Sequence, residues 1–185
     1  GNALFGVINL ITRSGAQVGG TEIGAGVSSH QSTEGRATLG TRFDNGADLL
    51  ASVSGLNSAG PNLYFPEFDA PATNDGHTAH TDYTRQGRFF ARLSQDTLSL
   101  TAAASRRAKG VPTGAYGADF NDRGHAYIDA QAYVDLAYAR RLSAASELSG
   151  RAFVADYSFS LPARYGSPVR NYDDAHGSWY GAEIK

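Results

Sequence analysis

The stretch Tyr127–Tyr138, YIDAQAYVDLAY, alternates strictly between two kinds of side chain. One set comprises Ile128, Ala130, Ala132, Val134, Leu136 and Tyr138, and the other comprises Tyr127, Asp129, Gln131, Tyr133 and Asp135. Side chains alternate across a β-strand, and no helical period fits these residues. The stretch therefore predicts one strand with an apolar face and a polar face.

The same alternation recurs along the chain and predicts seven strands and the start of an eighth. These runs begin near Ile23, Arg36, Asp48, Arg88, Thr97, Tyr127, Leu148 and Trp179. Asn45-Gly46 predicts a type I′ hairpin turn, because both central positions of that turn require positive φ. Short turns at 44–47, 95–96 and 142–146 alternate with long stretches at 58–84, 106–124 and 160–177. We therefore expect an all-β, antiparallel up-and-down sheet with long loops at one end only.

This division of the connections is typical of bacterial outer-membrane barrels, which have short periplasmic turns and longer extracellular loops. Aromatic residues near the predicted strand ends fit the interfacial girdles of such barrels: Phe43, Tyr83, Tyr127, Tyr138, Phe159, Trp179 and Tyr180. The pattern predicts an outer-membrane β-barrel in contact with outer-membrane lipid.

Composition excludes several other classes of function. The 185 residues carry 16 Lys and Arg against 18 Asp and Glu, a net charge of −2 that disfavours nucleic acid as the main partner. The absence of cysteine removes disulfides, thiolate metal sites and cysteine nucleophiles. G-x-S-x-G, H-E-x-x-H, Walker and G-x-G-x-x-G motifs are also absent, so we expect no enzyme and no cofactor. The chain starts at Gly1 and holds no methionine, which leads us to expect a processed form or a fragment.

Residues 1–13, GNALFGVINLITR, resemble the end of the plug domain of TonB-dependent outer-membrane receptors. The matching residues are Gly1, Ala3, Gly6, Val7, Ile8, Asn9, Ile11 and Thr12, whereas Leu10 and Arg13 are mild departures. The resemblance implies the plug end at 1–13, a linker at 14–19 and the N-terminal part of the transmembrane barrel at 20–185. Family members also have an energy-coupling box, a complete plug and 22 barrel strands. The resemblance therefore implies that this chain is a fragment and that its barrel is partial, about 7–8 strands of a larger barrel.

The resemblance also implies a function, namely the import of a metal chelate such as a ferric siderophore, or of cobalamin. The partners implied are the small chelate itself and the TonB complex, which acts through the missing N-terminal region. In such a receptor seven charged residues would face the lumen as structural charge: Arg36, Arg42, Arg88, Arg92, Asp129, Asp135 and Arg151.

The long stretch 58–84 contains the candidate ligand contacts. Tyr64, Phe65 and Phe68 can stack on a planar ligand, or they can pin the loop over the barrel mouth. His77 and His80 offer metal ligands, but a zinc site needs a third ligand and an ordered second shell, so no metal site is assigned. Acidic and amide residues in the later loops do not follow calcium-loop spacing and are interpreted as turn formers: Asp119, Asn121, Asp122, Asp173 and Asp174.

Two alternative classes stay open. A self-contained small outer-membrane barrel, used for adhesion or structure, is compatible with seven strands and a partial eighth. A soluble β-sandwich or lipocalin-like binding module shares the alternation, but it needs the apolar faces of its strands to meet in one core.

Overall fold

The computed structural model describes residues 11–185, so the predicted plug end at residues 1–13 lies outside the described residues except for its last three. The long strands are β1 (Gly20–Ser28), β2 (Ser32–Arg42), β3 (Asp48–Ser58), β6 (Thr84–Gln95), β7 (Leu98–Gly110), β8 (Ala126–Arg141), β9 (Glu147–Ala163) and β10 (Asn171–Ile184). The smaller elements are α1 (Gly15–Val18), the paired strands β4 (Leu63–Tyr64) and β5 (His77–Thr78), and 3₁₀ helices at Pro66–Phe68, Pro71–Gly76 and Ala115–Gly117.

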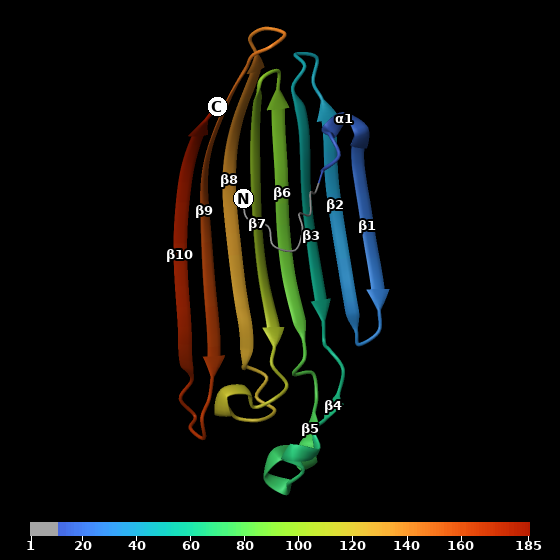
Figure 1. Cartoon of the computed structure of the whole chain (residues 1–185). Coiled ribbons are helices and arrows are strands. Elements are labelled where there is room, and N and C mark those ends of the chain that lie inside the picture. The colour runs from blue at the N-terminus through green and yellow to red at the C-terminus, as the bar shows by residue number, and fades with distance from the viewer. Residues whose placement is uncertain (1–10) are drawn as a thin grey trace.

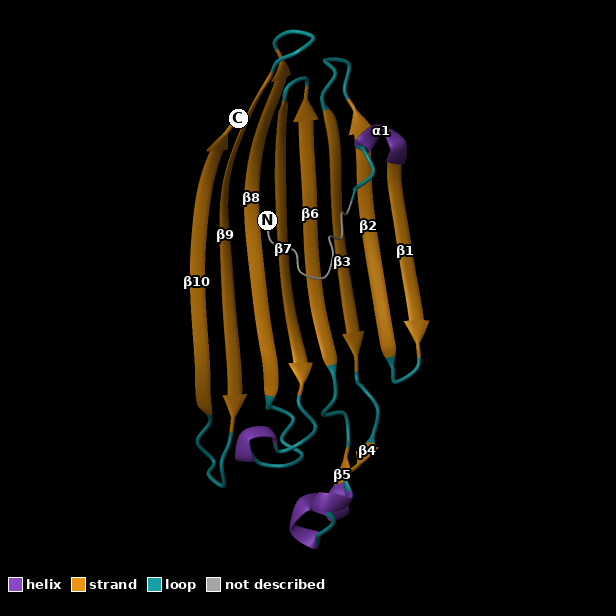
Figure 2. Cartoon of the chain, in the orientation of Figure 1, coloured by secondary structure: helices purple, strands orange, loops and turns teal. Residues whose placement is uncertain are grey.

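The eight long strands form one antiparallel sheet in the order β1-β2-β3-β6-β7-β8-β9-β10, which is also their order along the chain (Figure 1). This arrangement confirms the predicted all-β, up-and-down topology. The strands lie side by side as a single layer, with α1 at the turn end and the β4-β5 hairpin at the loop end (Figure 2). Within residues 11–185, β1 and β10 are the two edges and do not pair with each other, so the sheet does not close.

The strand register separates the side chains into two faces, because directly opposed residues in an antiparallel sheet point the same way. Val53 lies opposite Phe89, and Phe89 lies opposite Ala104, so the apolar residues of neighbouring strands share one face. This apolar face includes Ile23, Ala37, Leu39, Leu49, Val53, Phe89, Leu93, Leu98, Leu100, Val134, Leu136, Val154, Tyr180 and Ile184. The seven charged residues that were predicted to share the other face of the sheet do share it. We call this other face the polar face.

The apolar residues form a belt that crosses the strands obliquely. In β1 the belt is centred on Ala25, which lies opposite Gly35 of β2. In β10 the belt is centred on Ala182. The row of paired residues that contains Ala182 crosses the sheet and reaches β2 at Thr41, which lies six positions along β2 from Gly35. That offset is about 20 Å along a strand and accumulates over about 34 Å across the sheet. The strands therefore incline by roughly 30° to the belt's normal, close to the tilt in membrane barrels.

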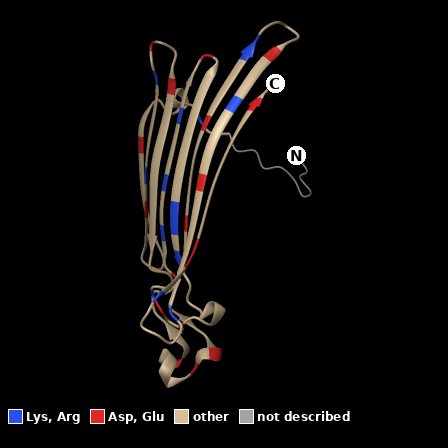
Figure 3. Cartoon of the chain, turned by 90° about the vertical axis from the view of Figure 1, so that its left-hand side faces the viewer, with Lys and Arg blue, Asp and Glu red and all other residues tan. Residues whose placement is uncertain are grey.

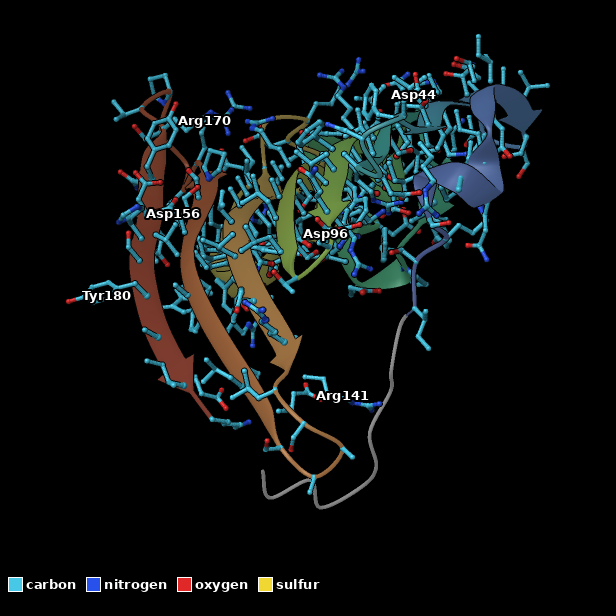
Figure 4. All side chains as sticks on the ribbon, turned by 90° about the horizontal axis from the view of Figure 1, so that it is seen from above. Asp44, Asp96, Arg141, Asp156, Arg170 and Tyr180 are labelled. Atoms are coloured by element: carbon cyan, nitrogen blue, oxygen red, sulfur yellow. The ribbon has the colours of Figure 1, made fainter. Side chains whose placement is uncertain are left out.

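The sheet has little core of its own. The chain exposes 12224 Å², whereas a compact globular protein of this mass exposes about 8,500 Å². In the described chain the buried apolar residues are mostly alanines, while residues of the belt are strongly exposed: Ile23 is 81% exposed and Tyr180 86%. Figure 4 shows the sheet bending into an arc, with Tyr180 pointing away from it. Among residues 11–185 no second sheet covers the apolar face, so the described sheet is a single layer rather than a sandwich.

The predicted strand ends are wrong at the loop end. Strand β7 continues to Gly110, β9 continues to Ala163, and β10 already begins at Asn171. The expected long loop at 160–177 therefore shrinks to residues 164–170. In the β9 extension the alternation continues with its polarity reversed: Ala155, Tyr157, Phe159 and Leu161 lie on the polar face, whereas Asp156, Ser158 and Ser160 lie on the face of the belt.

Two further details differ from the prediction. The turn between β2 and β3 is not type I′, because only Gly46 has positive φ, at 84°. The Asn45 side chain instead accepts a hydrogen bond from the Ala47 amide. Phe159 and Trp179 lie within strands and on the polar face, so they do not belong to a lipid-facing girdle.

Candidate functional site

Lys, Arg, Asp and Glu occur at intervals along the strands rather than at one point (Figure 3), and the strand register places seven of them on the polar face. Arg36 and Arg88 lie on either side of Ser54 in one ladder row. With Glu34 and Gln86 they line a hollow of about 390 Å³. On β8 and β9 the Arg151 Nε donates to the Asp135 carboxylate at 2.5 Å. The polar face thus carries an ion pair, further charged residues and a polar hollow.

The segment before β1 is attached to this polar face at the turn end. The Ser14 hydroxyl and the Gln17 side chain form a capping box around α1. Both oxygens of Asp48 accept hydrogen bonds from backbone amides of α1, those of Gly15 and Ala16.

Two more contacts hold the same segment. Arg13 makes a bidentate ion pair with Glu22, its nitrogens lying 2.9 and 2.6 Å from the two carboxylate oxygens. A Cβ on Gly40 would lie 2.6 Å from the Gly15 carbonyl oxygen and would collide with Val18. The chain therefore reaches β1 from the polar side of the sheet.

Three connections, residues 59–83, 111–125 and 164–170, gather at the other end and form what we call the loop cap (Figure 1). Phe68 stacks on Phe120 with ring centroids 4.3 Å apart, and Phe65 meets Phe120 edge-on at 5.9 Å. These contacts join the first loop to the second through buried aromatic area. Phe65 and Phe68 are half-buried in this contact, and their role as ligand contacts stays a prediction.

Asp122 joins the second loop to the third. Its side chain is 5% exposed and receives two hydrogen bonds from each of Arg164 and Arg170, at 2.9–3.3 Å. The Gly124 amide donates a further hydrogen bond to the same carboxylate. Burial alone raises the pKa of Asp122, but these donors outweigh it and lower the pKa to about 2. Asp122 therefore stays ionised and fixes both arginines.

His125 lies directly beside this ion cluster. It is 1% exposed, and neither ring nitrogen has a hydrogen-bond partner among the described residues. Burial lowers the pKa of His125; the Asp122 carboxylate raises it, and Arg170 lowers it further. The imidazole is therefore neutral at neutral pH. The sequence analysis missed both Asp122 as an ion-pair centre and His125, because no local motif marks either residue.

Two of the remaining candidates, Tyr64 and His77, are in contact. Tyr64 is exposed, donates its hydroxyl hydrogen bond to Asp69 at 2.9 Å and packs on His77 with ring centroids 4.9 Å apart. That hydrogen bond raises the pKa of Tyr64. His80 adopts a left-handed backbone at φ 56°. In the described part of the chain, no three His, Cys, Asp or Glu residues are grouped so that they could hold a metal ion.

One Ser-His-Asp grouping occurs on the apolar face, in the polar extension of β9 and β10. Ser178 donates to Asp156 at 2.8 Å, and His176 Nε2 lies 2.8 Å from the same oxygen. In a nucleophilic triad the serine is bonded to the histidine, which acts as its base. Here both residues are bonded to the aspartate instead, so this grouping does not activate Ser178.

Comparisons with protein-family models, with curated proteins and with solved structures find no match. Across residues 11–185, none of the helices has both the length and the apolar character that a bilayer crossing requires.

Proposed function

We propose that this chain forms part of the wall of a TonB-dependent outer-membrane receptor that imports a metal chelate such as a ferric siderophore. The observation that carries the proposal is the oblique, exposed apolar belt opposite a charged polar face. A face of this size and composition in water would promote association, whereas lipid covers it at no cost in exposed apolar area.

The seating of α1 supports a receptor with an internal plug over a simple barrel. The Arg13–Glu22 pair and the Asp48 contacts bring the preceding chain to the polar face, which would be the inside of a barrel. The resemblance of residues 1–13 to a plug end fits this direction of approach.

The unpaired edges β1 and β10 support a larger barrel. Unpaired backbone groups inside a bilayer cost several kcal/mol each, so a membrane sheet must continue until it closes. A small eight-stranded barrel would instead require β1, with 9 residues, to pair with β10, with 14. Under the proposal, further strands of the same receptor occupy both edges.

The test is to tag the native gene at the segment 142–146, isolate the outer membrane and measure the intact mass of the tagged protein. The proposal expects a mass several times 19.5 kDa and loss of ferric-chelate uptake when the gene is deleted. A mass near 19.5 kDa in the membrane would indicate a small barrel. Recovery in the soluble fraction would contradict both membrane assignments.

A further inference from the structure

The apolar face carries charged residues next to the belt, at the end nearest the loop cap, and the two signs of charge are separated across the sheet. The cations Arg85 and Arg106 lie on β6 and β7, whereas the anions Asp156 and Asp174 lie on β9 and β10. Strand β8 lies between the two groups and contributes only uncharged residues at this level. This part of the face is therefore balanced in charge, but it has a positive side and a negative side.

Arg106 and Asp156 are the members of the two groups that lie nearest to β8. Arg106 forms no ion pair with any residue from 11 to 185. Ser178 and His176 both contact Oδ2 of Asp156 at 2.8 Å, which leaves Oδ1 of this half-exposed carboxylate as an acceptor. Two strand spacings and one ladder row put the Cα atoms of Arg106 and Asp156 about 12 Å apart, so the two residues do not pair within one chain.

The hollow between these two residues is lined mainly by small side chains. It has a volume of about 480 Å³, and both Arg106 and Asp156 belong to its lining. Its other lining residues on this face are Gly87, Phe89, Ala104, Ala130 and Ala132. Small residues let the backbones of two membrane segments approach closely. A second wall can therefore come near enough for an arginine and a carboxylate to meet across the contact.

Arg106 and Asp156 also lie at the same height relative to the belt. Interpolation of the centre of the belt between β1 and β10 places it near Ala103 in β7 and near Phe153 in β9. Each charged residue lies about three residues beyond that centre, or about 10 Å along its strand toward the loop cap. The apolar band of a membrane barrel is about 25 Å tall, so both residues lie close to its edge.

We propose that this part of the apolar face is a two-fold contact between two copies of the protein, in which Arg106 of each copy pairs with Asp156 of the other. A two-fold axis along the membrane normal, opposite β8, exchanges the two sides of the surface and keeps every height. It therefore places the positive side of one wall against the negative side of the other. This rests on the proposed function, which puts the belt in lipid and makes the apolar face the convex outside of a barrel. Two convex walls meet along few strands, here β7, β8 and β9.

The separation of charge favours a second copy over other occupants. A lipid headgroup of either sign would be attracted to one side of the surface and repelled by the other. An unrelated protein would have to present the reverse arrangement of charges, whereas a second copy presents it through symmetry alone. Arg85 and Asp174 lie farther from β8 on the same two sides, so in the pair of copies they strengthen the same attraction.

Cross-linking in the outer membrane tests the contact. The full gene product is expressed from two copies of its gene that carry different tags. Ala130→Cys places a cysteine beside the proposed axis, so mild oxidation should link two copies and give a product that carries both tags. Gln131→Cys is the matched control, because Gln131 is the next residue of β8 and points to the polar face. The control should give no such product.

Charge reversal then tests the ion pairs. Arg106→Asp or Asp156→Arg, each alone with Ala130→Cys, should lower the cross-linked fraction roughly tenfold, because like charges then face each other. Combining the two reversals in one chain should restore cross-linking, as should co-expression of the two single reversals, and this recovery also shows that the variant chains fold. Arg107→Asp lies on the polar face and should leave cross-linking unchanged.

Absence of the doubly tagged product would overturn the proposal, as would cross-linking of Ala130→Cys to an unrelated protein. Cross-linking that neither single reversal lowers, or that Arg107→Asp lowers equally, would also overturn it. If the belt proves to lie in lipid and one of these results is obtained, only this inference fails. If the belt lies in water, the proposed function fails as well.

Discussion

Asp122 shows how single residues hold the loop cap together. One carboxylate, buried between two connections, accepts hydrogen bonds from two arginines that come 42 and 48 residues later in the chain. Removing the charge of such a residue leaves its cationic partners without compensation. The two guanidinium groups keep partial access to water, which moderates the loss.

We predict that Asp122→Asn releases residues 164–170 from residues 111–125 at a cost of about 2 kcal/mol. Hydrogen exchange of the amides in both segments should accelerate by the corresponding factor, while the belt strands keep their protection. Asp75→Asn, at an exposed position of the same cap, is the control and should leave exchange unchanged. Unchanged exchange in Asp122→Asn would mean that the aromatic cluster alone holds the cap.

The same carboxylate predicts an acid response of the cap. The pKa of Asp122 falls from an ordinary 3.8 to about 2 on folding, so its contribution is present above about pH 4 and is lost as the pH falls through 2. His125 affects the stability of the cap at higher pH. Burial lowers the pKa of His125 in the folded state, so the unfolded state takes up the proton first as the pH falls. The stability of the cap should therefore decrease as the pH falls below 6.5.

His125→Gln separates the two contributions. We predict that exchange protection of residues 111–125, corrected for intrinsic rates, declines between pH 7 and 5 in the parent protein. In the His125→Gln protein this decline should be absent, whereas the response below pH 4 should persist. An identical pH 7–5 profile in both proteins would show that His125 does not titrate on opening.

At the scale of elements, the attachment of α1 depends on the missing side chain at Gly40. We predict that Gly40→Ala lifts α1 from β2 and destabilises the turn end by about 1–3 kcal/mol. Proteolytic cleavage between residues 13 and 19 should become faster in this variant. Gly35→Ala on the same strand is the control, because a Cβ there meets no atom closer than 3.9 Å. Equal cleavage rates in both variants would contradict the packing described.

The elements also show what the sequence can and cannot predict. Alternation identified all eight long strands and assigned the charged residues, such as Arg88 and Asp135, to one face. It did not locate the end of β9, because there the alternation continues with its polarity reversed: Phe159 and Leu161 lie on the polar face and Ser158 lies on the face of the belt. The ion pairs of Asp122 carry no local signal, because their partners are far along the chain and meet only once the strands are in register.

On the scale of the whole molecule, the sheet exposes two edges and a broad apolar face. We predict that the 185-residue chain, produced alone in water without detergent, associates through the β1 and β10 edges or through the belt. Analytical ultracentrifugation should show oligomers, and detergent should disperse them. A monomeric, soluble chain that unfolds cooperatively would contradict this expectation and would favour a soluble binding module.

The belt is also the feature of the sequence that bears most directly on the proposed location of the sheet in a membrane. Its inclination of roughly 30° arises from a gradual shift of the apolar residues from strand to strand. Tilted strands that cross a flat bilayer require such a shift. The shift predicts that, within one ladder row, the residue on β6 lies in lipid and the residue on β10 lies outside it. Alternation alone does not predict this difference.

Site-directed labelling of the full gene product in its outer membrane tests this most directly. The segment holds no cysteine, so single cysteines at 133–136 of β8, and at 89 and 178 of one ladder row, can carry an oxygen- or nickel-sensitive spin label. We predict high oxygen accessibility at 134 and 136, high nickel accessibility at 133 and 135, lipid exposure at 89 and water exposure at 178. Uniform water exposure on β8, or equal lipid exposure at 89 and 178, would contradict a tilted membrane wall.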